Sequence, residues 1–489
     1  MISLPLLLIL LLTAAVFLGI GLVAARQQLG LEDYLTGGRR GGPGLAFATV
    51  TATTAGAWIL LSPPEAATWA GVAGLAGYAV GQAAPLVAFS VIGPRMRRLM
   101  PHGHNLTEYA RVRFGAGMLR FTVGMILFYM FVALTAELTG VALAFQLVAD
   151  LPPLLTAVVV AGAVVAYTSW GGLRASVWTD AFQCVVILPL LLVLFAVTWL
   201  RLGGMEGAFA PIADTRPELL RFDHGPGVKF GITLVLAILS ANLFNQGFWQ
   251  RVYLCRDDRT VRRGFLGAAV VIVPVIALAG LFGIFALGTG LEAGESSVAL
   301  FRVVLEVLPP WAVALVLVLG LALVMSSMDS LLTGMASVLT TQQHARRPEL
   351  GTGHLLRFSR WWTAALAVPA VLIASQGYSV LYLFLLADLV AAGMVVPLFA
   401  GLYSRHLRGR DAIAASAAGM AVGALFFPLP SFDPWLPYVP FAGDFLASFA
   451  AALLVSTALT VARARQRGRS RAYDFERLER EVEVLPGRG

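Results

Sequence analysis

Long apolar segments joined by short polar connections make up most of the chain. Segments able to cross about 30 Å of hydrocarbon as helices lie at 3–24, 44–70, 73–94, 117–149, 153–170, 176–202, 226–249, 262–289, 309–342, 356–375, 378–404, 411–428 and 441–463. A single segment satisfies its own backbone in lipid only as a helix. The pattern predicts an all-α polytopic membrane protein with about thirteen transmembrane helices. We expect one transporter-sized domain, 1–463, and a basic, charged cytoplasmic tail, 464–489.

Composition agrees with this class. Hydrophobic residues make up 58% of the 489 residues and charged residues 13%, and the mean hydropathy is +0.81. A soluble globule of this size needs more charge on its surface. The net charge of +8 comes from arginines in short connections and in the tail, so we expect a lipid bilayer and no nucleic acid as partner. Two cysteines, Cys184 and Cys255, indicate no disulfide or metal framework.

The arginines also predict the orientation. With the N-terminus outside, every inside connection is basic, for example 95–98, 256–263 and 405–410. The outside connections are short, mixed or acidic, and the longest, 203–225, is predicted to be a partly ordered loop. Basic residues concentrate on the cytoplasmic side of membrane proteins. We expect a cell membrane protein with its N-terminus outside, a retained first helix, and its C-terminus in the cytoplasm.

A polar cluster interrupts the apolar segment 309–342, where residues 321–330 read LALVMSSMDS. An acid at the centre of a bilayer costs roughly 2.5–3.5 kcal/mol on insertion scales, so such a cluster suggests a site. The hydroxyls of Ser326 and Ser327 supply uncharged oxygens, which suit a small hard cation such as Na⁺ when backbone carbonyls complete its shell. The alternative is that these hydroxyls bond back to their own helix.

The second apolar segment is predicted to be broken. Residues 48–71 read ATVTATTAGAWILLSPPEAATWAG, with Gly56 followed by Pro63 and Pro64. An unwound turn at membrane depth exposes carbonyls and amides that can hold an ion or a solute. A plain proline kink is the alternative.

Further polar residues lie within or near the predicted spans. Three of them are acids, for which an ion pair with a neighbouring arginine is the alternative to a binding role, and Asp180 could also be a solvated acid near the inner end of its span. Three are amides, which could instead bond across helices. These residues are Glu137, Asp180, Asp388, Asn242, Asn245 and Gln246.

Six separated stretches resemble the sodium:solute symporter family, which includes sodium/proline, sodium/pantothenate and sodium/glucose symporters. They are the broken second segment, EDYLTGGR (32–39), LTEYARVRFG (106–115), YTSWGGLRASVWTDAFQ (167–183), NQGFWQR (245–251) and VMSSMDS (324–330). Two regions, GAWILLSPPEAATWAG (56–71) and PRMRRLMPHGHNLTEYARVRFG (94–115), look closer to a branch of the family with urea and polyamine-type carriers. The resemblance implies the leucine-transporter-type fold, with an extra N-terminal helix and inverted five-helix repeats at about 44–202 and 226–404.

The resemblance also implies a Na⁺ site. Its ligands map onto the hydroxyls of Ser326 and Ser327 and the carbonyls of Ala52, Ala55 and Leu323, and the acid on the inner Na⁺ path maps onto Asp180. The sequence departs from two branches. Thr54 stands where the sodium/proline type has Asp, and Trp58 and Ile59 stand where the sugar type has Glu and Gln. A sugar requires several hydrogen-bonding side chains, so a sugar is disfavoured.

These observations predict Na⁺-coupled symport of a small polar organic solute by alternating access, with Na⁺ as the coupling ion and no obligate protein partner. The solute pocket is expected to contain Thr54, Gly56, Trp58, Asn242, Asn245 and Gln246. Glu137, Glu65 or Asp388 could face a cationic or amide solute. Two alternatives stay open, a proton-coupled carrier using Glu137, Asp180 or Asp388, and a passive channel or facilitator for a solute such as urea. An enzyme is not expected, because no nucleophile, base and orienting group stand at interpretable spacing.

Overall fold

The computed structural model describes residues 4–26, 30–292, 294–376, 379–429, 431, 433–467 and 472–482. Within these residues every regular element is a helix. The α-helices are α1 (Leu4–Ala25), α2 (Leu31–Thr36), α3 (Pro43–Thr54), α4 (Ser62–Leu99), α5 (Leu106–Phe114), α6 (Ala116–Ala149), α7 (Pro153–Arg201), α8 (Gly204–Thr215), α9 (Gly225–Asn242), α10 (Gln246–Leu254), α11 (Asp258–Gly288), α12 (Ala299–Val307), α13 (Pro310–Arg346), α14 (Thr352–Ala374), α15 (Val380–Phe399), α16 (Gly409–Phe426), α17 (Phe445–Gln466) and α18 (Glu476–Arg480). Short 3₁₀ helices are η1 (Gly37–Arg39), η2 (Ala57–Leu60), η3 (Pro217–Leu220), η4 (Ser296–Val298) and η5 (Ala400–Leu402).

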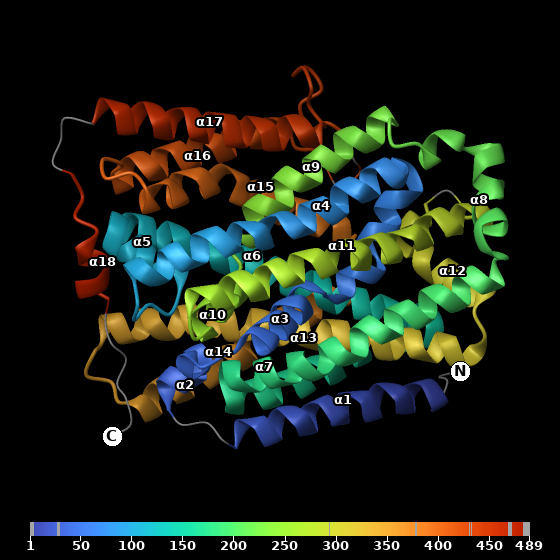
Figure 1. Cartoon of the computed structure of the whole chain (residues 1–489), viewed down its shortest axis with the longest axis horizontal. Coiled ribbons are helices and arrows are strands. Elements are labelled where there is room, and N and C mark those ends of the chain that lie inside the picture. The colour runs from blue at the N-terminus through green and yellow to red at the C-terminus, as the bar shows by residue number, and fades with distance from the viewer. Residues whose placement is uncertain are drawn as a thin grey trace.

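The long helices lie side by side along the longest axis of the molecule (Figure 1). The helices α8 and α12 lie at one end of the bundle, and α2, α5 and α18 lie at the other. We call these the α8 end and the α5 end. Nine helices in the described part of the chain are long and apolar enough to cross a membrane. The prediction of an all-α membrane protein is confirmed.

Glycines divide two of the long helices into the predicted pairs of spans. Gly71 breaks α4 with φ 62° and ψ −162°, between the segments predicted at 44–70 and 73–94. Gly172 breaks α7 with φ 53° and ψ −142°, between 153–170 and 176–202. Residues with a side chain rarely adopt such angles. Helices of the described residues lie over each of the thirteen predicted segments, although α14 and α16, at 356–375 and 411–428, are not among the nine that are apolar enough to cross a membrane.

The second span is interrupted, as predicted. The helix α3 ends with the bond from the Ala55 amide to the Thr51 carbonyl at 3.0 Å, and Ala55 and Gly56 are extended. The chain continues through η2 into α4, whose first turn holds Pro63 and Pro64, where a missing amide hydrogen costs no helical bond. The carbonyls from Ala52 to Ala55 therefore lie beyond the last bond of α3 and lack a helical partner.

A second interruption, which we did not predict, divides the segment 226–249. Here α9 ends at Asn242, and the side chain of Asn245 caps α10 by accepting the Gly247 amide at 2.9 Å. The indole of Trp249 donates to the Leu243 carbonyl at 2.8 Å. Side chains thus satisfy the backbone groups that the break frees, which is what allows a helix to be broken at membrane depth.

The polar connections are more ordered than predicted. The connection 203–225, predicted to be a partly ordered loop, contains the helices α8 and η3. The tail returns to the α5 end, where the Tyr473 amide donates to the Arg405 carbonyl at 2.8 Å and its hydroxyl donates to the Val112 carbonyl at 3.0 Å. Residues 468–471 and 483–489 of the predicted tail lie outside the described residues.

The break at Gly71 gives a first prediction. A Cβ at this position meets the Leu219 backbone of η3, and the backbone angles are those that glycine almost alone adopts. We expect Gly71→Ala to lower stability by about 1–3 kcal/mol, which thermal unfolding of the detergent-purified protein measures as a lower Tm. The matched control is Gly162→Ala in α7, because a Cβ there meets nothing within 4 Å. Equal Tm values for the two variants would contradict this account of the turn.

Candidate functional site

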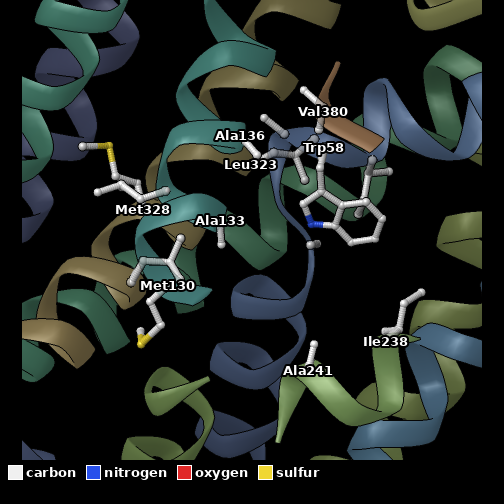
Figure 2. Close-up of a cluster of buried hydrophobic side chains, with 14 of the residues drawn as sticks. Trp58, Met130, Ala133, Ala136, Ile238, Ala241, Leu323, Met328 and Val380 are labelled. Atoms are coloured by element: carbon white, nitrogen blue, oxygen red, sulfur yellow. The ribbon is translucent and has the colours of Figure 1, made fainter. Parts of the chain in front are cut away.

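A cavity lies where the broken second span faces α4, α6, α9, α13 and α15. It contains about 670 Å³ of space between atoms, including its opening. Figure 2 shows Trp58 on the unwound segment, with Ala133 of α6 on one side and Ile238 of α9 on the other. The cavity is lined by Thr53, Thr54, Trp58, Tyr78, Gln82, Tyr129, Ala133, Glu137, Leu234, Ile238, Asn242, Asn245, Ser327, Leu331, Leu381, Phe384, Leu385 and Asp388.

The carboxylate of Glu137 is attached to the broken helix. Its Oε2 accepts the backbone amide of Ala57, the first residue of η2, at 2.6 Å, and its side chain is 2% exposed. A Cβ on Gly56 would collide with this carboxylate, so glycine is needed for the close approach. Glu137 therefore both stabilises the unwound turn and brings a carboxylate into the cavity.

Asp388 of α15 is a second acid on the cavity wall. It is 4% exposed and makes no hydrogen bond or ion pair to any described residue. No lysine, arginine or histidine stands among the described residues that line the cavity. The arginine partner that we considered for Glu137 and Asp388 is thus absent from the described wall. The cavity presents two carboxylates without a cationic side chain.

Aromatic side chains complete the cavity wall near Trp58. The Trp58 indole stacks on the Tyr78 ring with centroids 5.8 Å apart, and the Phe384 ring meets it edge-on at 6.2 Å. Aromatic faces attract cations as well as apolar groups. The cavity therefore combines carboxylate oxygens with aromatic surfaces.

The two serines of the predicted Na⁺ site lie on α13 opposite the end of α3. Ser326 donates its hydroxyl to Asp180 Oδ1 at 2.5 Å, whereas Ser327 donates to the carbonyl of Leu323, another predicted ligand, at 3.1 Å. The bond back to the helix that we considered as an alternative is thus present for Ser327. The hydroxyls of Thr53 and Ser330 lie 3.2 Å apart, which holds α3 against α13 one turn from these serines.

Asp180 is fully buried rather than a solvated acid, so that alternative is wrong. Its Oδ2 accepts the guanidinium of Arg251 at 2.7 Å and the hydroxyl of Thr49 at 2.5 Å. The ion pair with an arginine, the other alternative, is present. The same Arg251 nitrogen donates to Ser176 at 2.8 Å and Ser330 at 2.6 Å, so one guanidinium connects α7, α10 and α13.

Asp329 is the third charge of this network. Its carboxylate accepts the hydroxyls of Tyr167 at 2.8 Å, Ser176 at 2.6 Å and Thr179 at 2.9 Å. Asp329 is the acid of the stretch LALVMSSMDS, whose presence in an apolar span suggested a site, but neither Asp329 nor Arg251 was predicted to have a role of its own.

The cavity gathers most of the residues expected to contact solute. Thr54, Trp58, Asn242, Asn245, Glu137 and Asp388 line it, and Gly56 adjoins Glu137. Gln246 lies elsewhere. Its Oε1 accepts the Leu106 amide at 3.2 Å, and its Nε2 donates to the His104 carbonyl at 3.1 Å. Gln246 thus holds the connection before α5 against α10.

A charged cluster ties connections together at the α5 end. The ring of buried His104 contacts Glu32 at 2.7 Å and Glu108 at 3.1 Å, and Arg39 donates to Glu32 at 2.8 Å. Burial acts to lower the pKa of His104, but the charges and hydrogen bonds of Glu108 and Glu32 raise it to about 9. Burial acts to raise the pKa of Glu32, but His104 and Arg39 lower it to about 2. His104 is therefore an imidazolium between two carboxylates at neutral pH.

Comparison with known proteins identifies relatives that match most of the length of this chain. The model of the sodium:solute symporter family matches residues 34–419. The spermidine transporter of Candida albicans is 30% identical over 426 residues, which cover 85% of this chain and 78% of that transporter. The sodium/pantothenate symporter of Escherichia coli is 24% identical over 475 residues, 90% of this chain and 93% of that symporter.

A solved structure shares the fold. The substrate-bound, outward-open structure of a Na⁺-coupled sialic acid symporter superposes with a TM-score of 0.77 at 17% identity, covering 96% of this chain and 99% of that chain. The leucine-transporter-type fold expected from the sequence is confirmed. At this level of identity the likeness concerns the fold and not the solute.

The charged cluster at the α5 end gives a second prediction. The pKa of His104 is about 9 in the folded protein against 6.5 for an ordinary histidine, so its stabilisation is complete below pH 6.5 and is lost as the pH rises through 9. We expect the Tm advantage of the wild type over His104→Gln to shrink between pH 6.5 and 9.5. His354→Gln, at an exposed histidine, is the control and should follow the wild type. Parallel Tm curves for the wild type and His104→Gln would show that His104 is neutral in the folded protein.

Proposed function

Because the chain belongs to the sodium:solute symporter family, we propose that the solute it takes up together with Na⁺ is a small organic amine, bound as a cation. Membership makes the protein an integral membrane symporter that couples a small organic solute to Na⁺ by alternating access. Proton coupling and passive permeation, the two alternatives from the sequence, are therefore not favoured. The choice of solute rests on the cavity.

The observation that carries the proposal is the pair of uncompensated carboxylates, Glu137 and Asp388, in one buried cavity. A buried charge without a partner is expensive. An ammonium group on the solute supplies that partner, and the faces of Trp58, Tyr78 and Phe384 add cation–π attraction. The 30% identity to a spermidine transporter, a carrier named for an amine, supports the same choice.

The proposed Na⁺ site lies between the end of α3 and the middle of α13. Its ligands are the free carbonyls of Ala52 and Ala55, the Leu323 carbonyl and the hydroxyls of Ser326 and Ser327. These oxygens are hard and uncharged, which suits Na⁺. Asp180 supplies a negative charge beside the site, since the Ser326 hydroxyl donates to its carboxylate at 2.5 Å. This position also suits Asp180 for the inward release of Na⁺.

Coupling follows from the segment that both ligands share. Na⁺ at Ala52 and Ala55 and an amine at Glu137 both act on the turn from Ala52 to Ala57, because Glu137 accepts the Ala57 amide. Each ligand favours the conformation in which this turn is ordered. Two ligands that prefer the same conformation raise each other's affinity. Glu137 is the proposed link between them.

The proposed orientation places the α8 end outside the cell membrane and the α5 end in the cytoplasm. The basic connections at 95–98, 256–263 and 405–410 support this assignment, because positive charges are retained on the cytoplasmic side. The N-terminus would then lie outside and the C-terminus inside.

The Na⁺ site gives a third prediction. The double variant Ser326→Ala and Ser327→Ala removes two of five proposed ligands, so we expect it to lose the Na⁺-specific rise in Tm, measured against K⁺ or choline at equal ionic strength. A ligand that binds only the folded state stabilises it by RT ln(1 + [L]/Kd). Ser337→Ala, on the same helix and at a hydroxyl that lacks a hydrogen-bond partner in the described structure, should keep the rise. A double variant that still responds to Na⁺ like the wild type would rule out this site.

The amine proposal gives a fourth prediction. We expect Glu137→Gln, which keeps an acceptor for the Ala57 amide, and Asp388→Asn each to raise the half-saturation concentration for an amine at least tenfold. A lost buried charge pair costs about 2 kcal/mol or more, and each 1.4 kcal/mol is about tenfold. The measurement is Na⁺-driven uptake of labelled 1,4-diaminobutane into proteoliposomes.

Glu306→Gln is the control for this experiment, because Glu306 pairs with Arg302 on α12, away from the cavity. It should leave amine uptake at the wild-type level. Wild-type protein that responds to Na⁺ but neither binds nor transports any amine would overturn the amine proposal while leaving the Na⁺ site standing.

A further inference from the structure

A hollow on the flank of the helix bundle, which we call the side groove, lies at the α5 end. It is bordered by the end of α5, the start of α6, the end of α13 and the start of α14, and its lining residues fall within 111–124, 339–346 and 358–362. The side groove contains about 1260 Å³ of space, including its opening. It shares no lining residue with the cavity of the proposed amine site, so the two are separate spaces.

One part of the side groove is apolar. Its wall is formed by Leu119 and Val123 of α6, Leu339 of α13, and Phe358 and Trp362 of α14. The two aromatic rings lie one turn apart on α14, with centroids separated by 6.1 Å. Each of the five side chains belongs to a segment that the sequence predicted to lie in hydrocarbon. An apolar wall at this depth suits a hydrocarbon chain.

The other part of the side groove is basic. Arg111, Arg120 and Arg346 line it, and no Asp or Glu stands among the described lining residues. Arg120 and Arg346 are exposed, and their guanidinium groups make no hydrogen bond or ion pair with any described residue. Arginine matches the geometry of a phosphate group with several donors at once, so this part of the groove favours a phosphate.

The two parts follow one another along the helices. On α13, Leu339 and Arg346 are seven residues apart, which is two turns on the same face and about 10 Å along the helix axis. On α6, Arg120 precedes Val123 by three residues, which also places both on one face. The arginines lie nearer the α5 end, because α6 follows α5 in the chain and the last turns of α13 contact α5.

The surface beside the side groove is apolar and exposed. Gly124 of α6 lines the groove, Phe128 lies one turn further along and is 41% exposed, and Trp361 of α14 is 61% exposed. Exposed apolar side chains of a membrane protein contact lipid, and tryptophan is enriched where the bilayer meets water. The neighbouring arginines therefore stand at the level of lipid headgroups.

We propose that the side groove binds an anionic phospholipid of the cytoplasmic leaflet, with its phosphate held by Arg120 and Arg346 and an acyl chain along the apolar wall. Such a lipid matches both parts of the groove at once, whereas a soluble anion would leave the apolar wall uncovered. Basic pockets between helices on the cytoplasmic side of membrane proteins bind negative headgroups. The leaflet follows from the proposed orientation, and the site does not depend on which solute is carried.

The test measures lipid binding to the purified full-length protein by native mass spectrometry, with phosphatidylglycerol and phosphatidylcholine of identical acyl chains. We expect the wild type to bind phosphatidylglycerol about tenfold more tightly, because each arginine near an anionic headgroup adds to the attraction. Arg120→Gln combined with Arg346→Gln should reduce this preference below about twofold. A wild type that binds the two lipids equally would overturn the proposal.

The matched control removes the same charge from another place. Arg262→Gln combined with Arg263→Gln changes two exposed arginines in the first turns of α11, which do not line the side groove, so this variant should keep the wild-type preference. Without added lipid, both double variants should melt within about 2 °C of the wild type, because surface substitutions change stability little. Equal loss of the preference in both would indicate a diffuse surface charge and overturn the site.

Gly124→Phe tests the apolar part with the arginines unchanged. A Cβ at Gly124 meets nothing within 4 Å, so a larger side chain can enter the groove without a clash. We expect Gly124→Phe to lower the affinity for phosphatidylglycerol several-fold, and Gly124→Ala to bind like the wild type. Undiminished binding by Gly124→Phe would contradict an acyl chain in the groove.

The headgroup alone distinguishes a lipid from a soluble anion. Glycerol 3-phosphate carries the phosphate without the acyl chains, so we expect it to raise the Tm of the wild type much less than phosphatidylglycerol does at the same concentration. An equal rise with glycerol 3-phosphate would identify a soluble anion as the ligand and overturn the lipid site.

Discussion

The rest of the structure depends on one constraint, the need to satisfy the charges of Arg251, Asp180 and Asp329 where no water is available. A charge transferred from water into a low-dielectric interior loses several kcal/mol of solvation even after relaxation. The guanidinium of Arg251 contacts Asp180 and two serine hydroxyls, and Asp329 accepts three hydroxyls. These contacts form only when α3, α7, α10 and α13 are correctly placed. The network thus fixes α3 against α13, which is the geometry that the proposed Na⁺ site requires.

Within a few residues, the broken second span exposes carbonyl oxygens, which carry a partial negative charge, and amides, which carry a partial positive charge. The end of α3 leaves carbonyl oxygens free, and the start of η2 leaves amides free, one of which Glu137 accepts. Free carbonyls attract cations and free amides attract carboxylates. A single break therefore prepares a cation site on the α13 side and positions an acid for the solute on the α6 side. The proximity of the two explains how an ion and a solute can act on one hinge.

The sequence was informative wherever local chemistry determined the structure. The lengths of the apolar segments predicted the helices, and Gly56 with Pro63 and Pro64 predicted the break in the second span. The break before Asn245 was missed, because it has neither glycine nor proline and depends on the capping by Asn245 and the contact of Trp249. The partnership of Asp180 and Arg251 joins residues far apart in the chain. Nothing in the residues around either member identifies the other, so it could be proposed only as one alternative. Gln246 was expected in the cavity, but its orientation depends on the helical phase of α10 after that unpredicted break.

The arrangement of acids also addresses a difficulty of moving two cations together. Na⁺ and an ammonium bound near the same turn repel each other, and in a medium of low dielectric this repulsion would oppose coupling. The structure places a carboxylate beside each proposed position, with Asp180 bonded to Ser326 and Glu137 bonded to Ala57. Glu137 thus stands beside the proposed ammonium, and Asp180, which Arg251 also contacts, stands beside the proposed Na⁺ position, so carboxylates next to both cations offset the repulsion between them. The charge of Arg251 is likewise balanced by the carboxylate of Asp180, which it contacts at 2.7 Å. An unbalanced guanidinium at this depth would exclude Na⁺ from the neighbouring serines.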